Sequence, residues 1–161
     1  MTSRRITPLF PAPLHGLDPA RRADAYAGWL AAGAAGLTAE TAAVTLLAEH
    51  GTWLERPSFT SRCIDIADDV PEQAGTSGYA AGIRWRAAIT GISRHGATGT
   101  EQAILRIAAS IAAGIPVSLH DCLGSLDTPA LAAVLRAIAH ANSGWRGHDL
   151  LCHGPVQDPP F

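Results

Sequence analysis

The densest cluster of metal-ligating side chains in this sequence lies close to its C-terminal end, at His148, Cys152 and His153. Imidazole and thiolate groups are the ligands that Zn²⁺ takes in structural sites, so the predicted chemistry is zinc binding. Adjacent Cys152 and His153 point apart in a regular helix, so a loop would have to bring them to one ion. The additional candidate ligands are His120, Cys122 and His140. The alternative, which we favour, is that these are tail residues without a ligand role.

A tryptophan between two arginines, Arg84-Trp85-Arg86, is the second candidate site, and Arg94 and His95 follow it. A base stacked on Trp85 between guanidinium groups would be a reasonable mode of single-strand binding. Trp85 also falls on an apolar helical stripe, and an indole buried in a core cannot stack on a base. We therefore favour a core tryptophan with solvated arginines, and keep a nucleic-acid interface through Arg84, Arg86 and Arg94 as the alternative.

Two other clusters combine reactive residue types with unsuitable spacing. Cys122 follows a helix start expected at Ser118, where a thiol pKa is lowered, and His120 is a nearby base. Residues two apart face different ways on a helix, so a Cys–His nucleophile pair is not favoured. Four acidic residues resemble a cation loop but lack the spacing and central glycine of an EF-hand, and we interpret them as a solvated loop. They are Asp65, Asp68, Asp69 and Glu72.

Charge and composition narrow the classes of function. A net charge of −2 argues against a generic polyanion binder, because nucleic-acid affinity depends on neutralising phosphates. All 12 basic residues are arginine, which we attribute to codon bias in a GC-rich genome rather than to anion recognition. Three cysteines without regular spacing favour a reducing cytoplasm over a disulfide framework. Neither a signal peptide nor a membrane-spanning segment is expected.

Helices must position these side chains, because helical signals dominate the sequence. Thr98 and Glu101 form a capping box, and Gly114 with Pro116 ends the helix that they start. Thr128 caps the next helix, and the two helices predict a C-terminal hairpin. The expected buried stripe of the second helix is Leu131, Val134, Leu135 and Ile138.

The fold class predicted from these patterns is all-α, a compact array or bundle of four to six helices. Residues 58–66 fit either a short helix or a strand, and we favour the helix because a lone strand has no recognisable partner. Residues 67–78 are predicted as an exposed loop. Additional helices are predicted over residues 19–35, from 38 to about 54 and over 79–95, with a single turn over 118–123.

Composition divides the chain into three regions. Residues 1–17 are a proline-rich, flexible N-terminal arm, residues 18–144 are a single helical domain, and residues 145–161 are an irregular tail. Both termini are therefore expected to be extended.

Three sequence blocks carry a resemblance when they are taken in order. They are His-Gly-Thr-Trp-Leu at 50–54 with Phe59 and Cys63, Gly-Thr-Glu-Gln-Ala-Ile-Leu-Arg-Ile-Ala-Ala-Ser at 99–110, and Leu126-Asp127 leading into residues 138–141. With these blocks the chain resembles a group of short, uncharacterised actinobacterial helical proteins over about residues 38–142. The resemblance implies a helical fold and carries no activity, cofactor or residue role.

These observations predict a non-enzymatic cytoplasmic module that binds a protein partner, or a second copy of itself, through a helical face. The first alternative is a nucleic-acid-associated, DNA-binding helical protein that uses the Arg/Trp face. The second is a metal-binding protein that uses the C-terminal His/Cys cluster, in which case the cofactor is zinc. No other cofactor and no membrane partner is expected.

Overall fold

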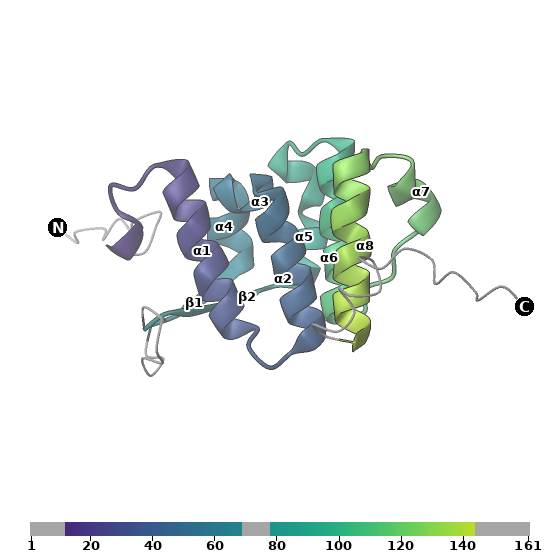
Figure 1. The fold of residues 1–161 in the computed structure, drawn as a ribbon. Helices are drawn as coiled ribbons and strands as arrows, with labels where there is room; N and C mark the ends of the chain where they lie inside the picture. The colour runs from purple at the N-terminus through teal and green to yellow at the C-terminus, as the bar shows by residue number, and fades with distance from the viewer. Residues whose placement is uncertain (1–11, 69–77, 144–161) are drawn as a thin grey trace, which may run out of the picture.

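The computed structural model describes residues 12–68 and 78–143, and α-helices dominate these residues (Figure 1). The helices are α1 (Pro19–Gly33), α2 (Thr38–His50), α3 (Thr52–Glu55), α4 (Pro57–Cys63), α5 (Trp85–Thr90), α6 (Gly99–Ala113), α7 (Leu119–Leu123) and α8 (Thr128–Ser143). Two 3₁₀ turns, η1 (Ala12–Leu14) and η2 (Ile92–His95), and two strands, β1 (Ile64–Ala67) and β2 (Ala80–Ile83), complete the described elements.

The predominance of helix is confirmed, but four to six helices is too few. The described residues contain eight, because the run that begins at Thr38 breaks twice. Gly51 has a positive φ of 78°, which ends α2, and Pro57 starts α4 as its first residue.

Helix α2 lies at the centre of the packing and contacts α1, α6 and α8. The Trp53 indole N–H, just after α2, donates to the Glu101 carbonyl at the start of α6 (2.9 Å). The Arg136 guanidinium in α8 pairs with Glu49 near the end of α2 (2.9 Å), whereas His140 lies farther back along α2, beside Ala42. Both α6 and α8 are therefore antiparallel to α2 and parallel to each other. They are not the predicted hairpin, because the segment containing α7 carries the chain back (Figure 1).

The start signals of the helices are mostly confirmed. Thr98 Oγ1 accepts from the Glu101 N–H (3.4 Å), and Glu101 Oε2 accepts from the Thr98 N–H (2.6 Å), which is the predicted capping box. The predicted N-cap of α8 is wrong by one residue. Asp127 Oδ1 accepts from the Ala130 N–H (2.8 Å), so Asp127 caps α8 and Thr128 is the first helical residue.

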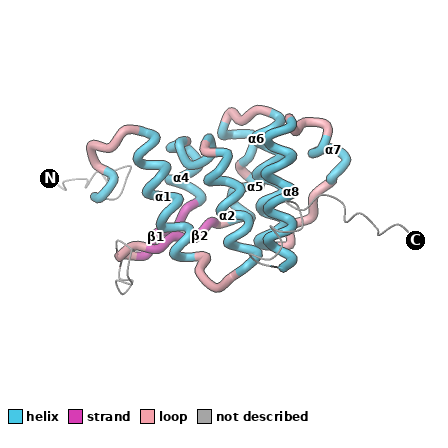
Figure 2. Tube along the Cα trace, in the orientation of Figure 1, coloured by secondary structure: helices cyan, strands magenta, loops and turns pink. Residues whose placement is uncertain are grey.

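The prediction of one helix over residues 79–95 is wrong. This segment forms β2, α5 and η2 in succession. The strand expected to lack a partner pairs antiparallel with β2, from Ile64 opposite Ile83 to Ala67 opposite Ala80 (Figure 2). Residues 58–66 are accordingly split, since helix α4 ends at Cys63 and β1 follows at once.

Helix α1 crosses this two-stranded sheet at a glycine. A Cβ placed on Gly33 would lie 2.0 Å from the Ala81 carbonyl oxygen in β2. The missing side chain therefore lets the end of α1 contact the backbone of β2. This contact holds the two-stranded sheet against the helices.

The hydrophobic core includes residues from the helices and from both strands. Trp53 and Phe59 are fully buried, with ring centroids 5.1 Å apart. Leu14 in η1 is also buried, so the core includes a residue from the segment predicted as a flexible arm. No helix of the described ranges is both long and apolar enough to cross a lipid bilayer.

Candidate functional site

The outward face of α8 exposes three large apolar side chains in a row. Leu131, Leu135 and Ile138 are 37%, 46% and 45% exposed, and their spacing places them on one face of the helix. We call these three residues the α8 outer stripe. They were predicted to be buried, and of that predicted stripe only Val134 is. The residues that face inward are Ala130, Ala133, Val134 and Ala137.

The reversal follows from side-chain size. Helix α8 packs most extensively on α2, and three of its four buried side chains are alanines that permit close approach of the two backbones. The bulkier leucines and the isoleucine then have no room in this seam. Periodicity alone could not distinguish the two faces, because both are apolar.

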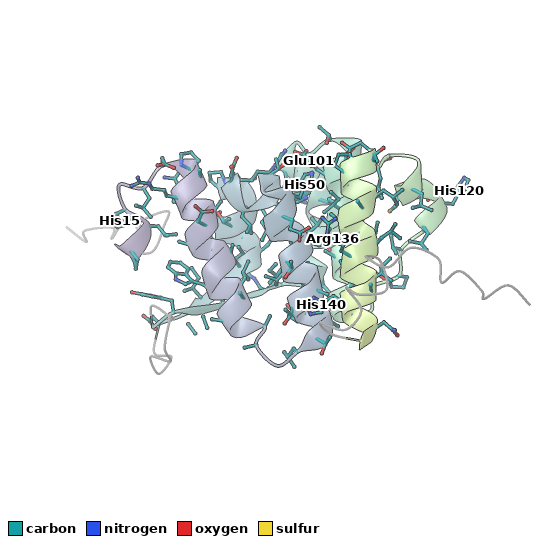
Figure 3. All side chains as sticks on the ribbon, in the orientation of Figure 1. His15, His50, Glu101, His120, Arg136 and His140 are labelled. Atoms are coloured by element: carbon teal, nitrogen blue, oxygen red, sulfur yellow. The ribbon has the colours of Figure 1, made fainter. Side chains whose placement is uncertain are left out.

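The α8 outer stripe carries no charge. Arg136 is the one ionisable group of α8 besides His140, and Figure 3 shows both residues between α2 and α8. Leu119 and Leu123 on helix α7 are also exposed. An uncharged row of large apolar side chains is typical of a helix that packs against another helix.

A second candidate site is a cleft of about 470 Å³ between α4, α5 and η2, which we call the α4–α5 cleft. Its side chains come from elements that are distant in sequence but in contact in the fold. The lining residues with hydroxyl, thiol, guanidinium or imidazole side chains are Ser58, Arg62, Cys63, Thr90, Arg94 and His95.

Ser58 and His95 form a hydrogen-bonded pair in this cleft. The His95 Nδ1 and Ser58 Oγ atoms are 3.1 Å apart, and the ring packs edge-on against Trp53 and Phe59. Burial lowers the pKa of His95, and the positive charges of Arg62 and Arg56 lower it further, so the ring is neutral at pH 7. The other ring nitrogen, Nε2, is buried and has no hydrogen-bond partner within the described ranges.

An ion pair behind the cleft holds the 3₁₀ turn in place. Arg56 donates to Glu101 Oε1 (2.7 Å) and to the His95 carbonyl (2.5 Å), and its guanidinium lies 5.5 Å from the centre of the Trp53 ring. The Glu101 carboxylate also accepts from the Thr98 N–H. This network joins the end of α3, the end of η2 and the start of α6.

The arginines predicted to form a nucleic-acid interface lie before α5, on α5 and on η2. Trp85 is buried and its indole N–H donates to Glu40 (2.9 Å), which confirms the prediction of a core tryptophan. Arg84 pairs with Asp65 (3.4 Å) and donates to the Arg62 carbonyl. Arg86 is exposed on α5, whereas Arg94 lines the α4–α5 cleft. The stacking site imagined around Trp85 is therefore not formed.

The reactive-residue hypotheses at Cys122 and at the metal cluster have different outcomes. Cys122 is buried while His120 is exposed and points outward from α7 (Figure 3), so the two do not form a nucleophile pair. Among residues 12–68 and 78–143, no three His, Cys, Asp or Glu side chains come together in a metal-binding group. His148, Cys152 and His153 lie outside the described residues, as do Asp69 and Glu72.

We expect the two described thiols to react slowly. Burial raises the pKa of both Cys63 and Cys122, contrary to the lowering expected at a helix start, and both cysteines are free. In a Cys152→Ser variant, titration with an aromatic disulfide reagent at pH 8 should give slow reaction of both thiols in native protein and fast reaction in denaturant. A native thiol that reacts as fast as a small-molecule thiol would contradict this.

Sequence reasoning missed several of these residues. Ser58 and Arg62 carried no signal, because each becomes part of the cleft only when α4 packs against α5. Leu119 and Leu123 are four residues apart on α7, and this spacing could have indicated an exposed apolar face.

Comparison with known proteins adds no assignment: no family model, no curated protein and no solved structure matches this chain.

Proposed function

We propose that this protein is a non-enzymatic, cytoplasmic helical interaction module that self-associates through the α8 outer stripe. The observation that carries the proposal is the row of Leu131, Leu135 and Ile138, each more than a third exposed. Single exposed apolar residues are ordinary on protein surfaces, but three along one helix face form a packing stripe.

A second copy of the chain is the partner that the chemistry of this face favours. A two-fold axis places the same patch of both subunits in contact, so the patch must be complementary to itself. The α8 outer stripe meets this requirement, because it is apolar and Arg136, the helix's one arginine, is paired with Glu49 at the seam with α2. Two copies can thus approach without repulsion between like charges.

The substitution Leu135→Glu should convert the self-associated protein to a monomer. It places a carboxylate in the middle of the apolar stripe, where burial of an unpaired charge is strongly unfavourable. Sedimentation equilibrium of the full chain over a range of concentrations measures the change. The fold should be retained, since Leu135 is 46% exposed, and far-UV circular dichroism checks this.

Leu37→Glu is the matched control. Among the described residues, Leu37 is the most exposed large apolar side chain, at 59%, but it lies at the turn between α1 and α2. This variant should associate like the wild type. A wild-type chain that stays monomeric at all concentrations would refute the proposal, and so would an oligomer that Leu135→Glu leaves intact.

A further inference from the structure

The α4–α5 cleft has a charge pattern that suits an anion. Arg62 on α4 and Arg94 on η2 line it from two elements, and none of its lining residues is acidic. Within the described part of the chain, neither guanidinium takes part in an ion pair, whereas Arg56 and Arg84 nearby do. Two guanidinium groups at one hollow match a dianion, and arginine binds phosphate oxygens in a bidentate manner.

The His95 ring supplies a second, independent indication of a ligand. Its side chain is more than nine-tenths buried, with 8% of the residue exposed, and Nε2 has no partner among the described residues. When the Ser58 hydroxyl donates to Nδ1, Nε2 carries the proton and is a donor. Buried donors without partners are rare in native proteins and require an explanation, such as a bound group.

Gly91 lies against this ring nitrogen. A Cβ at Gly91 would lie 3.5 Å from His95 Nε2 and 3.3 Å from the Ala87 carbonyl oxygen. Because glycine has no side chain, no Cβ covers the imidazole edge at this point. Ala87, Gly91 and Cys63 form the less polar part of the lining.

We propose that the α4–α5 cleft binds a small phosphate monoester, with Arg62 and Arg94 holding the phosphate group. The volume of about 470 Å³ lies within the range of small-molecule sites. A monoester carries up to two negative charges near neutral pH, which matches the two arginines, and its organic part fits against the less polar wall. No residue of α8 lines the cleft, so this binding is independent of the proposed self-association.

The site is a binding site rather than a nucleophile–base pair. A serine–histidine pair acts in catalysis when a third group orients the other ring nitrogen. In the described residues nothing occupies this position at His95 Nε2. Ser58 and His95 are therefore part of the wall of the proposed binding site.

Isothermal titration of the full chain with phenyl phosphate tests the proposal. We expect saturable binding with one site per chain, and at least about tenfold weaker binding in Arg62→Gln and in Arg94→Gln, since each removes one charge-assisted contact. Arg86→Gln is the control, because Arg86 is an exposed arginine of α5 outside the cleft and its loss should leave the affinity unchanged. Circular dichroism confirms that each variant is folded.

Two further probes separate the sources of the phosphate group. Inorganic phosphate should bind more weakly than phenyl phosphate, and a single-stranded oligonucleotide, titrated at two salt concentrations, should not compete. Equal binding of inorganic phosphate would overturn the monoester assignment. Preferential, steeply salt-dependent binding of the oligonucleotide would overturn it in favour of a nucleic-acid surface. Absence of phenyl phosphate binding at millimolar concentration, or equal weakening by Arg86→Gln, would refute the site.

Discussion

Replacing Gly33 with alanine should destabilise the fold by about 3 kcal/mol, a typical upper value for overpacking in a tight contact. The new Cβ would lie 2.0 Å from the Ala81 carbonyl oxygen and 3.0 Å from the Ala81 carbonyl carbon. These are backbone atoms, so a change of rotamer cannot relieve the clash. The strand must move away from α1, and contacts on both faces of the crossing are lost. Urea unfolding followed by circular dichroism measures the change in the free energy of unfolding.

Gly28→Ala is the matched control on the same helix. A Cβ at Gly28 meets nothing within 4 Å, and alanine is a better helix former by up to about 1 kcal/mol. This variant should therefore be slightly more stable than the wild type. If the two substitutions change the free energy of unfolding in opposite directions, the effect at Gly33 comes from its contact with β2. A Gly33→Ala protein as stable as the wild type would contradict the described crossing.

The second large effect is expected at the ion pair behind the cleft. Glu101→Gln should lower the free energy of unfolding by about 3 kcal/mol, because it leaves the largely buried Arg56 guanidinium without its counter-charge. The two side chains are only 22% and 10% exposed. Asp65→Asn is the control, since it breaks an exposed pair with Arg84 and should cost less than about 1 kcal/mol. Equal losses in the two variants would contradict the importance of burial.

The pH dependence of stability gives an independent test of Glu101. Burial raises the pKa of this carboxyl, but the hydrogen bonds from Thr98 and Arg56 outweigh burial and hold the pKa below its usual value. The unfolded chain therefore takes up the proton first, at about pH 4.3. The stability from this group is present above that pH and is lost as pH falls through the lower native pKa. Between pH 6 and 3, the free energy of unfolding of Glu101→Gln should decline less than that of the wild type.

A double variant tests whether Arg56 and Glu101 stabilise the fold as a pair. Arg56→Met combined with Glu101→Leu removes both charges and fills the space with apolar atoms, so its loss of stability should be smaller than the sum of the single losses. Additive losses would indicate that the two side chains act separately.

Local signals predicted the starts of several helices, but neither the strands nor the contacts between elements. The capping box at Thr98 and Glu101 depends on residues three apart, and the sequence contains all of it. The β1–β2 pair joins Ile64 to Ile83, and each strand is only four residues long. Such short strands have no clear alternation, so only the tertiary contact with α1 distinguishes them from helix.

The two candidate sites were hidden from the sequence for different reasons. Helix α8 has one face rich in alanine and another rich in leucine, and both are apolar. Which face is buried depends on the packing against α2. In the cleft, Ser58 and Arg94 are brought together by the packing of α4 against α5, which no spacing encodes. Arg94 was identified as a functional candidate, but for a nucleic-acid interface whose proposed stacking residue, Trp85, is buried.

The central place of α2 has a consequence for synthesis of the chain on the ribosome. The apolar sides of α2 are covered by α6 and α8, which are translated long after it. The Trp53 indole N–H likewise has its acceptor, the Glu101 carbonyl, only after α6 has begun to be synthesised. A nascent polypeptide that has not reached α6 therefore exposes the apolar sides of α2 to solvent and to other proteins. Stalled or prematurely terminated products should consequently be substrates for chaperones and proteases.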